Sequence, residues 1–306
     1  MRVAIAGSGG VARYLVEELT ADGNEVVVLT RSKKFFFDVV SGVEQFIADY
    51  SNVESLMKGM EGATTVIVAI LDHSSAFVDI SSRIIEAAKR SPTVTRLIPS
   101  EYSGNIEDFP DMPRFEAIIH EPIRKILRAQ TELEYTLLAN GWFVDYLIPT
   151  HNRHLNDIGD ANPVNFAKRT IQIPGTGKEG VDLTAVRDMA RAVAKLLRAP
   201  SGEWDEITNI SGEKSTWNEV AALIKEKNPD MIVSYRTLNN FIDDLHASKT
   251  DWDRLLAGFG IHSASGAGSL PAHRVAAQRA KFFAGVKFRT ARDVVEEAEC
   301  NPDTII

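Results

Sequence analysis

Short apolar runs alternate with longer amphipathic stretches along the first half of the chain. In the amphipathic stretches, apolar residues recur at every third or fourth position, which is typical of a helix with one buried face. The stretch at 77–90 is the clearest of these, and Pro92 ends it. The alternation is typical of a parallel sheet with helices on both faces. We expect strands at residues 3–6, 25–29, 44–48, 64–71, 95–99 and 135–139, and helices at 14–20, 52–60, 77–90 and 116–131.

The pattern changes after about residue 150, where the elements become more scattered. We expect a strand and turn at 170–177 and helices at 184–197 and 216–227. Ser215 or Thr216 is suited to cap the last of these helices, with Glu219 near its third position, and Ser51 is suited to cap the helix at 52–60. The segment 262–269 is made mostly of small residues and lies between helical stretches. It is either a lid over a pocket or a disordered connector.

Composition and charge exclude several classes of protein. The formal net charge is −8 over 306 residues, which provides no basic surface for nucleic acid. Cys300 is the only cysteine, so internal disulfides and cysteine-based metal sites are excluded, and no other spacing suggests a metal. The longest uninterrupted apolar stretch, 66–71, is too short to cross a bilayer. We expect no leader segment and a cytoplasmic location, with neither nucleic acid nor a membrane as partner.

The first apolar strand runs into a glycine-rich turn that leads directly into a helix. Gly7, Gly9 and Gly10 stand at this junction. Glycines there allow a tight turn and a close approach of the backbone to a pyrophosphate, which then lies on the N-terminus of the helix. We therefore expect a dinucleotide site in a Rossmann-type, doubly wound parallel sheet. Its pyrophosphate ligands would be Gly7, Ser8, Gly9, Gly10 and Val11.

The end of the second strand indicates which dinucleotide is bound. An NAD site of this type has a carboxylate about 20 residues after the glycines, which binds the ribose 2′-hydroxyl. This chain instead has Arg31, Lys33 and Lys34. A guanidinium matches a phosphate dianion, which a carboxylate would repel. Arg31, assisted by Lys34, is thus expected to bind the 2′-phosphate of NADP(H); the alternative is a solvated basic turn.

Several short motifs, taken in order, resemble one family over nearly the whole length. The chain resembles the NmrA-like and isoflavone-reductase-like branch of the atypical short-chain dehydrogenases, and most of all its fungal members. The resemblance covers the glycine loop with Ala12-Arg13, Arg31 after the second strand, the run Arg96 to Tyr102, Tyr135-Thr136 leading to Asn140 to Phe143, the helix start Val186 to Ala190, and a closing strand at Val286 to Thr290.

This resemblance implies an NADP-binding domain at 1–150 and a smaller α+β substrate lobe at 151–306, the two intertwined. It implies that Ile70 and the loop Pro99, Ser100, Glu101, Tyr102 face the nicotinamide, and that Asp49 lies near the adenine. Enzymes of the family reduce phenylpropanoid-type or polyketide-type molecules, often in secondary metabolism. Other members are redox-sensing regulators that bind the cofactor without turning it over, and the fold does not decide between these roles.

The sequence offers several candidates for the proton donor. Short-chain dehydrogenases use Tyr-x-x-x-Lys, and no tyrosine here has a lysine four residues later. Plant members of the family place a lysine on the helix after the Pro-Ser-Glu loop. Our alignment puts Ile123 at that place, and Lys125 two residues later points about 200° away. The catalytic candidates are Lys125, Tyr102 and Ser100. The alternative for Lys125 is a solvated surface lysine, for Tyr102 an aromatic residue that only packs, and for Ser100 a serine that only forms the turn.

Other residues near the expected cleft can also be assigned expected roles. Glu101 is expected to hold the loop in shape through backbone N–H groups rather than to act as a base. His120, His151 and His154 are further proton-transfer candidates, since histidine titrates near neutral pH. Candidate walls of an apolar cavity are Trp142, Phe143 and Tyr146, which are equally well core residues.

We therefore expect an NADPH-dependent oxidoreductase that transfers a hydride to an aromatic or polyketide-like small molecule. The cofactor carries the reactivity, so positioning is the main demand on the protein. One alternative is an NADP(H)-sensing regulator that binds a partner protein, and another is an isomerase or dehydratase on the same fold. A homodimer is compatible with the sequence.

Overall fold

A six-stranded parallel sheet forms the larger lobe of the computed structural model, which describes residues 1–306. The strand order is β3-β2-β1-β4-β5-β6, and every neighbouring pair is parallel. The order reverses between β1 and β4, and a doubly wound sheet binds ligands at such a switch point. The strands are β1 (Arg2–Ala6), β2 (Glu25–Thr30), β3 (Val43–Ile47), β4 (Thr65–Val68), β5 (Arg96–Ile98) and β6 (Glu134–Tyr135).

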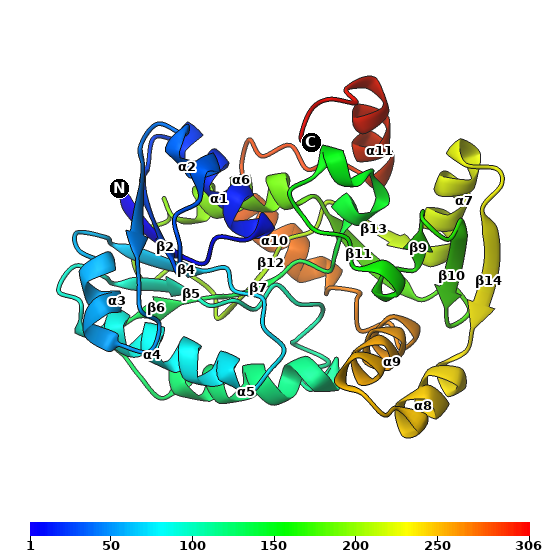
Figure 1. Ribbon diagram of the computed structural model, residues 1–306, viewed down its shortest axis with the longest axis horizontal. Coiled ribbons are helices and arrows are strands. Elements are labelled where there is room, and N and C mark those ends of the chain that lie inside the picture. The colour runs from blue at the N-terminus through cyan, green and yellow to red at the C-terminus, as the bar shows by residue number, and fades with distance from the viewer.

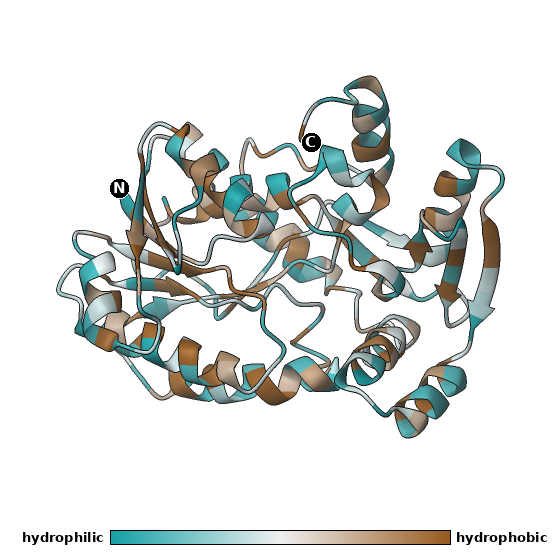
Figure 2. Cartoon of the chain, in the orientation of Figure 1, coloured by the Kyte–Doolittle hydropathy of each residue, from teal (hydrophilic) through white to brown (hydrophobic).

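Helices cover both faces of this sheet, as Figure 1 shows. Side chains alternate along β1, with Val3 and Ile5 in the core under α1 and α6, and Ala4 and Ala6 in the core under α3, α4 and α5. Figure 2 shows the apolar character of these central strands against the mixed character of the helices. The helices are α1 (Gly10–Ala21), α2 (Phe35–Asp38), α3 (Val53–Gly59), α4 (Ala76–Arg90), α5 (Arg114–Arg128) and α6 (Val186–Leu196).

The smaller lobe is built from short strands and from helices on its outside. Its three small sheets have the orders β14-β10-β9, β13-β11-β8 and β12-β7. Their strands are β7 (Leu137–Ala139), β8 (Trp142–Phe143), β9 (Val164–Asn165), β10 (Thr170–Pro174), β11 (Gly180–Thr184), β12 (Ile207–Asn209), β13 (Glu213–Thr216) and β14 (Ile232–Arg236). The helices are α7 (Trp217–Lys227), α8 (Leu238–Ala247), α9 (Asp251–Ala264), α10 (Ala272–Phe282) and α11 (Ala291–Cys300), with short 3-10 turns η1 (Val144–Leu147), η2 (Thr150–Asn152) and η3 (Gly159–Ala161).

The two halves of the chain are interleaved in space. β7 and β8 come from the first half, yet β7 pairs with β12 and β8 pairs with β11. Thr136 marks the point where the expected strand at 135–139 splits in two, because its hydroxyl shares a 2.7 Å hydrogen bond with that of Thr208. The chain thus leaves the six-stranded sheet after β6 and enters the smaller lobe at β7.

Three local features differ from the sequence prediction, and one cap agrees with it. The expected strand at 64–71 ends at Val68. Asn52, not Ser51, caps α3, because its side chain accepts the amide N–H of Ser55. The expected closing strand at 286–290 pairs with no other strand, since Arg289 binds Asp188 instead. Thr216 does cap α7, in the expected reciprocal arrangement with Glu219.

The segment 262–269 is ordered, so the expectation of a disordered connector was wrong. Residues 262–264 complete α9, and the turn at 265–269 packs under the loop that follows β5. The amide N–H of Asn105 donates to Ala267 at 2.8 Å, and His262 is almost fully buried against Gly104, where a Cβ atom would lie 2.7 Å from the imidazole. Small residues are needed here because the backbone at Ala267 closely approaches the backbone at Gly104 and Asn105. None of the helices combines the length and the apolar content that a membrane span requires.

Candidate active site

The glycine turn after β1 has the shape of a dinucleotide loop. Gly7 has φ +121°, and a Cβ atom there would lie 2.3 Å from the carbonyl oxygen of Ala69, so no other residue fits. A Cβ atom at Gly10 would lie 2.7 Å from the carbonyl oxygen of His154, because α1 packs closely on that segment. Gly9 has nothing within 4 Å of its Cβ direction and offers no side-chain cap to α1. The N-terminus of α1 is thus open to an anion, which fits a pyrophosphate.

Unpaired cations stand beside this loop at the end of β2. Arg31 is exposed and makes no ion pair, and neither does the ammonium of Lys34, whose backbone is held by Gln45. Lys33, by contrast, pairs with Asp38 at 3.2 Å. Thr30 links the two segments, since its hydroxyl donates to the hydroxyl of Ser8 at 3.2 Å. The structure therefore leaves Arg31 and Lys34 available for a phosphate.

Asp49 and Tyr50 follow β3 on the same edge of the sheet. Asp49 accepts hydrogen bonds from the hydroxyl and amide of Ser51 at 2.6 and 2.9 Å, and these bonds lower its pKa. The Tyr50 hydroxyl donates to the carbonyl oxygen of Leu29 at 2.7 Å. The Asp49 carboxylate is thus held within its own turn, at the rim where an adenine site was expected.

Two hydroxyl groups tie the loop after β5 to the chain after β4. Ser100 donates to the carbonyl oxygen of Ile70 at 2.7 Å, and Tyr102 donates to that of Val68 at 3.0 Å. Tyr102 has φ +42°, and burial raises the pKa of its phenol. Both hydroxyl protons are therefore engaged by backbone carbonyls, so these residues position the loop next to Ile70 and Pro99.

Glu101 joins the same loop to α5 through a buried charged cluster. Its carboxylate accepts from Nη2 and Nε of Arg124 at 2.5 and 3.3 Å and lies 3.1 Å from Nδ1 of His120. Burial alone would raise the pKa of Glu101, but these hydrogen bonds and charges lower it to about 2. Glu101 does hold the loop in shape, as expected, but through two side chains of α5 rather than through backbone N–H groups.

Of the three histidines named as proton-transfer candidates, His120 is the one that the fold brings to this loop. Its side chain is only 9% exposed, and of its two ring nitrogens only Nδ1 has a partner in the protein. Burial would lower the pKa of His120, but the hydrogen bond and charge of Glu101 raise it above the usual value. Glu116 lies one helical turn earlier, and burial raises the pKa of its carboxyl to about 7. The cluster thus contains a carboxyl group with a pKa of about 7 and an imidazole whose pKa lies above its usual value.

The other proton-transfer candidates lie elsewhere. Lys125 is on the outer side of α5, 73% exposed and 3.8 Å from Glu121, so the structure does not bring it to the loop. His151 is exposed in η2. His154 is turned toward α1, with Nε2 2.6 Å from Glu17.

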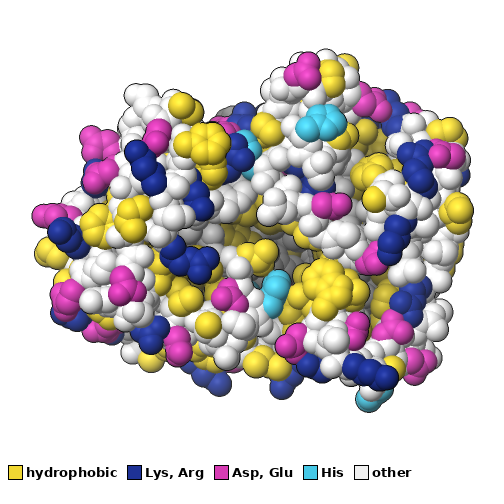
Figure 3. Space-filling model, in the orientation of Figure 1, with side chains coloured by type: hydrophobic (Ala, Val, Ile, Leu, Met, Phe, Trp, Pro, Cys, Tyr) yellow, Lys and Arg dark blue, Asp and Glu magenta, His cyan; other side chains and the backbone are white.

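A row of aromatic rings runs beside the charged cluster. The rings of His73 and Phe115 are 5.5 Å apart, those of Phe115 and Phe259 are 4.9 Å apart, and those of Phe259 and Trp142 are 5.7 Å apart. Figure 3 shows a hollow in this face of the molecule, between the six-stranded sheet and the smaller lobe, with apolar side chains and a histidine at its rim. Of the expected walls, Trp142 belongs to this row, whereas Phe143 and Tyr146 pack against the core under α1.

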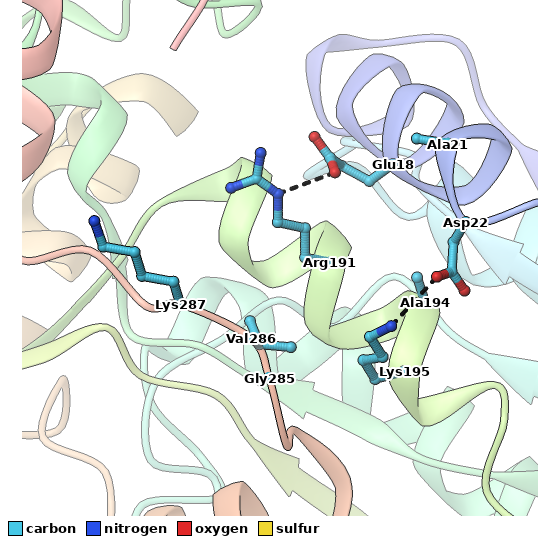
Figure 4. A pocket seen from close by; sticks show the side chains of 9 residues that line it. All are labelled: Glu18, Ala21, Asp22, Arg191, Ala194, Lys195, Gly285, Val286 and Lys287. Atoms are coloured by element: carbon cyan, nitrogen blue, oxygen red, sulfur yellow. Dashed lines mark hydrogen bonds and ion pairs between the residues drawn. The ribbon is translucent and has the colours of Figure 1, made fainter.

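A separate cavity of about 380 Å³ lies at the other end of α1, between α1, α6 and residues 285–287 (Figure 4). Arg191 pairs with Glu18 and Lys195 with Asp22, whereas Lys287 has no ion-pair partner. The cavity lies one helix length from the glycine loop and is therefore separate from the candidate active site.

Comparison with known proteins agrees with this fold. Residues 2–242 match the model of the NmrA-like family. The oxidoreductase swnR of Arthroderma benhamiae is 40% identical over 307 aligned residues, covering 100% of both chains. The crystal structure of an isoflavone reductase has a TM-score of 0.72 at 19% identity, covering 97% of this chain and 98% of that chain. The Escherichia coli quinone oxidoreductase QOR2, complexed with NADPH, has a TM-score of 0.71 at 17% identity, covering 97% and 99%.

The two solved structures share the fold, and the relative from Arthroderma benhamiae shares the whole length at substantial identity. Together with the match over 2–242, this confirms the resemblance drawn from the glycine loop and the run Arg96 to Tyr102. The chain belongs to the NmrA-like family.

Proposed function

We infer that this protein is an NADP(H)-dependent oxidoreductase, and we propose that it transfers a hydride to an aromatic or polyketide-like small molecule bound in the hollow. The observation that carries this proposal is that the open glycine loop and the Glu101–His120 pair stand at the same carboxyl edge of one sheet. The full-length relative swnR is named an oxidoreductase, and the structural neighbour QOR2 binds NADPH.

The residues present fit the cofactor. The backbone of Gly7, Ser8, Gly9, Gly10 and Val11 would hold the pyrophosphate, because the α1 N-terminus is uncapped and Gly9 leaves space for a close approach. Arg31 and Lys34 would hold the 2′-phosphate, since neither has a carboxylate partner. Ile70, Pro99, Ser100 and Glu101 would border the nicotinamide, with Asp49 at the adenine rim. When bound, the cofactor supplies the hydride.

His120 is our candidate for the proton donor, in place of Lys125 and Tyr102. Because the ionised Glu101 accepts the Nδ1 proton, the imidazolium presents its other proton at Nε2. Arg124 holds Glu101 in the orientation that this requires. Glu116, with a pKa of about 7, is suited to return a proton to the cluster.

The hollow favours a reductase over a regulator. A reductase needs a space that opens onto the nicotinamide side, and the hollow in Figure 3, which has apolar side chains at its rim, supports this proposal. The row of aromatic rings between the two lobes favours flat apolar substrates, and one structural neighbour is an isoflavone reductase. No part of this proposed site requires a second copy of the chain.

The experiment is to follow NADPH oxidation with a panel of aromatic ketones, enones and quinones. Turnover with at least one aromatic carbonyl, and little with short aliphatic ones, is the expected result. NADPH binding without oxidation by any acceptor would contradict hydride transfer and would favour the NADP(H)-sensing regulator.

A further inference from the structure

β14 is an edge strand of the sheet β14-β10-β9, and its outer side pairs with no other strand of the chain. Figure 1 shows it at the outer margin of the smaller lobe, away from the six-stranded sheet. Residues 232–235 are all exposed, and three of them are large apolar residues. Ile232, Val233 and Tyr235 are 67%, 38% and 56% exposed. An edge strand of this kind is a template for the addition of a further strand.

The hydrogen bonds to β10 determine which backbone groups of β14 are unpaired. β14 runs parallel to β10. The amide of Ile232 donates to the carbonyl oxygen of Arg169 at 2.9 Å, and the carbonyl oxygen of Arg236 accepts from the turn after β10 at 2.8 Å. The even-numbered residues of β14 therefore bond to β10. Since the backbone groups alternate in direction along a strand, those of Val233 and Tyr235 point out of the open edge.

This edge lacks the features that usually keep a strand from pairing with another molecule. Residues 231–237 contain no lysine and no proline, and the ladder with β10 continues without a bulge. The charges at the two ends of the strand are paired within the chain, Asp230 with Arg169 and Arg236 with Asp244. The open edge is therefore not protected by an unpaired charge.

We propose that β14 pairs with β14 of a second copy of this chain, antiparallel about a two-fold axis at Ser234. Val233 of one copy then lies opposite Tyr235 of the other, and the two residues exchange both of their unpaired backbone hydrogen bonds. The two-fold axis produces this pair twice. A β-branched residue opposite an aromatic one is a favourable cross-strand pair. The sheets β14-β10-β9 of the two copies thus join into one sheet, and this inference does not rest on the proposed function.

Hydrogen bonds at the two ends of the strand exclude the neighbouring registers. The amide and the carbonyl oxygen of Met231 are both bonded within the turn before the strand. The amide of Thr237 donates to the cap of α8 at 3.0 Å. A two-fold axis at Val233 would require the groups of Met231, and an axis at Tyr235 would require those of Thr237. The axis at Ser234 is the one that uses unpaired groups alone.

Charge complementarity favours a second copy in this orientation. Asp230 lies just before the strand and Arg236 at its end. The register makes Asp230 of one copy the diagonal neighbour of Arg236 of the other, at a distance that a long side chain spans. An acidic residue therefore approaches a basic one at both ends of the contact. Because the contact is limited to one strand edge, we expect a weak and reversible dimer.

The first test places one cysteine on the axis, in a Cys300→Ser background that removes the native cysteine. Residue 234 and its symmetry mate form a non-hydrogen-bonded pair, with Cα atoms about 4.5 Å apart, which suits a disulfide. Ser234→Cys should therefore form a disulfide-linked dimer in air, visible on a non-reducing gel. Ile232→Cys is the matched control, because it is also exposed but lies about 13 Å or more from its mate.

The second test measures association without a covalent link, by sedimentation velocity over a wide range of protein concentrations. Wild type should form a reversible dimer. Val233→Lys should raise the dissociation constant of that dimer about tenfold or more, because the lysine enters the contact at two symmetric positions. Ile118→Lys changes an exposed apolar residue of α5 in the other lobe and should associate as wild type does. Chemical denaturation establishes that each variant is folded.

Disulfide formation in Ser234→Cys but not in Ile232→Cys, with weaker association of Val233→Lys, is the expected result. A wild type that stays monomeric at every concentration would leave the edge to a strand of another protein and would overturn pairing between two copies. Equal linking of the two cysteine variants would overturn the axis at Ser234. None of these measurements uses NADPH or turnover, so failure of the proposed function would leave this test intact.

Discussion

Nδ1 of His120 lies 3.1 Å from Oε1 of Glu101, and both of these side chains are nearly buried. Glu101 is on the loop after β5 and His120 is on α5, so this contact connects the loop expected at the nicotinamide with a titratable group. Arg124 completes the arrangement, because its Nη2 donates to the same Oε1 atom and its Nε donates to Oε2. The pair gives the site an oriented imidazole.

The first prediction concerns proton transfer. His120→Gln should lower kcat by about 10²- to 10⁴-fold, because the proton donor is lost, and should leave the dissociation constant of NADPH unchanged. The measurement is steady-state oxidation of NADPH with the best aromatic acceptor, beside calorimetry. His151→Gln, at an exposed position, is the matched control. Full activity in His120→Gln would show that another group donates the proton.

The second prediction concerns the pH profile. Since Glu101 raises the pKa of His120, kcat should fall as pH rises through that raised value. Glu116 also raises it and Arg124 lowers it, and both remain in Glu101→Gln. In Glu101→Gln, burial becomes the dominant influence on the pKa of His120 and lowers it. The alkaline limb of the profile should therefore move to lower pH. A limb at the same pH in both proteins would exclude His120 as its source.

The third prediction concerns the glycine loop. Gly7→Ala should abolish NADPH binding and destabilise the fold, because Cβ would lie 2.3 Å from the Ala69 carbonyl oxygen. Gly23→Ala is the control, since Gly23 also has positive φ, +82°, but has nothing within 4 Å. It should cost only the backbone strain, about 1–2 kcal/mol. Chemical denaturation measures the stability of each variant, and calorimetry measures its affinity for NADPH. Equal losses of stability and affinity in the two variants would mean that the contact with Ala69 is unimportant.

The fourth prediction concerns stability at acid pH. His262 is buried with no ion-pair partner, and burial lowers its pKa to about 4. Its folded pKa is below its unfolded value, so its contribution is present above about pH 6.5 and is lost as pH falls toward 4. Wild type should lose up to about 3 kcal/mol more than His262→Gln over this interval. Denaturation curves of both proteins at pH 7 and pH 4 measure this difference in stability loss. Equal losses in the two proteins would mean that water reaches the imidazole.

Local patterns are the basis of the predicted cofactor half of the candidate site. Gly7, Gly9 and Gly10 are adjacent in sequence, and Arg31 follows a strand whose place is fixed by its apolar run. The helical stripe at 77–90 likewise depends only on neighbouring residues and appears as α4. Such features need no knowledge of contacts between distant segments.

The other half of the site depends on contacts between distant segments. Glu101 and Arg124 meet across the loop and α5, and Phe115 meets Phe259 from the other lobe. One signal was present in the sequence: His120 and Arg124 stand among apolar residues on one side of α5. Polar groups in a buried stripe need partners, and the partner was the glutamate of the loop. The buried residues of this helix are Ala117, Ile119, His120, Ile123, Arg124 and Leu127.

The most direct test of the account is a calorimetric titration of wild type and Arg31→Ala with NADPH and NADH. Wild type should bind NADPH much more tightly than NADH. Arg31→Ala should lose about 10- to 100-fold in NADPH affinity, the value of a charge-assisted hydrogen bond to phosphate, and little in NADH affinity. Lys33→Ala, whose ammonium already pairs with Asp38, should behave as wild type. Equal affinities for the two cofactors, or equal losses in Arg31→Ala, would contradict the assignment of an NADP(H) oxidoreductase.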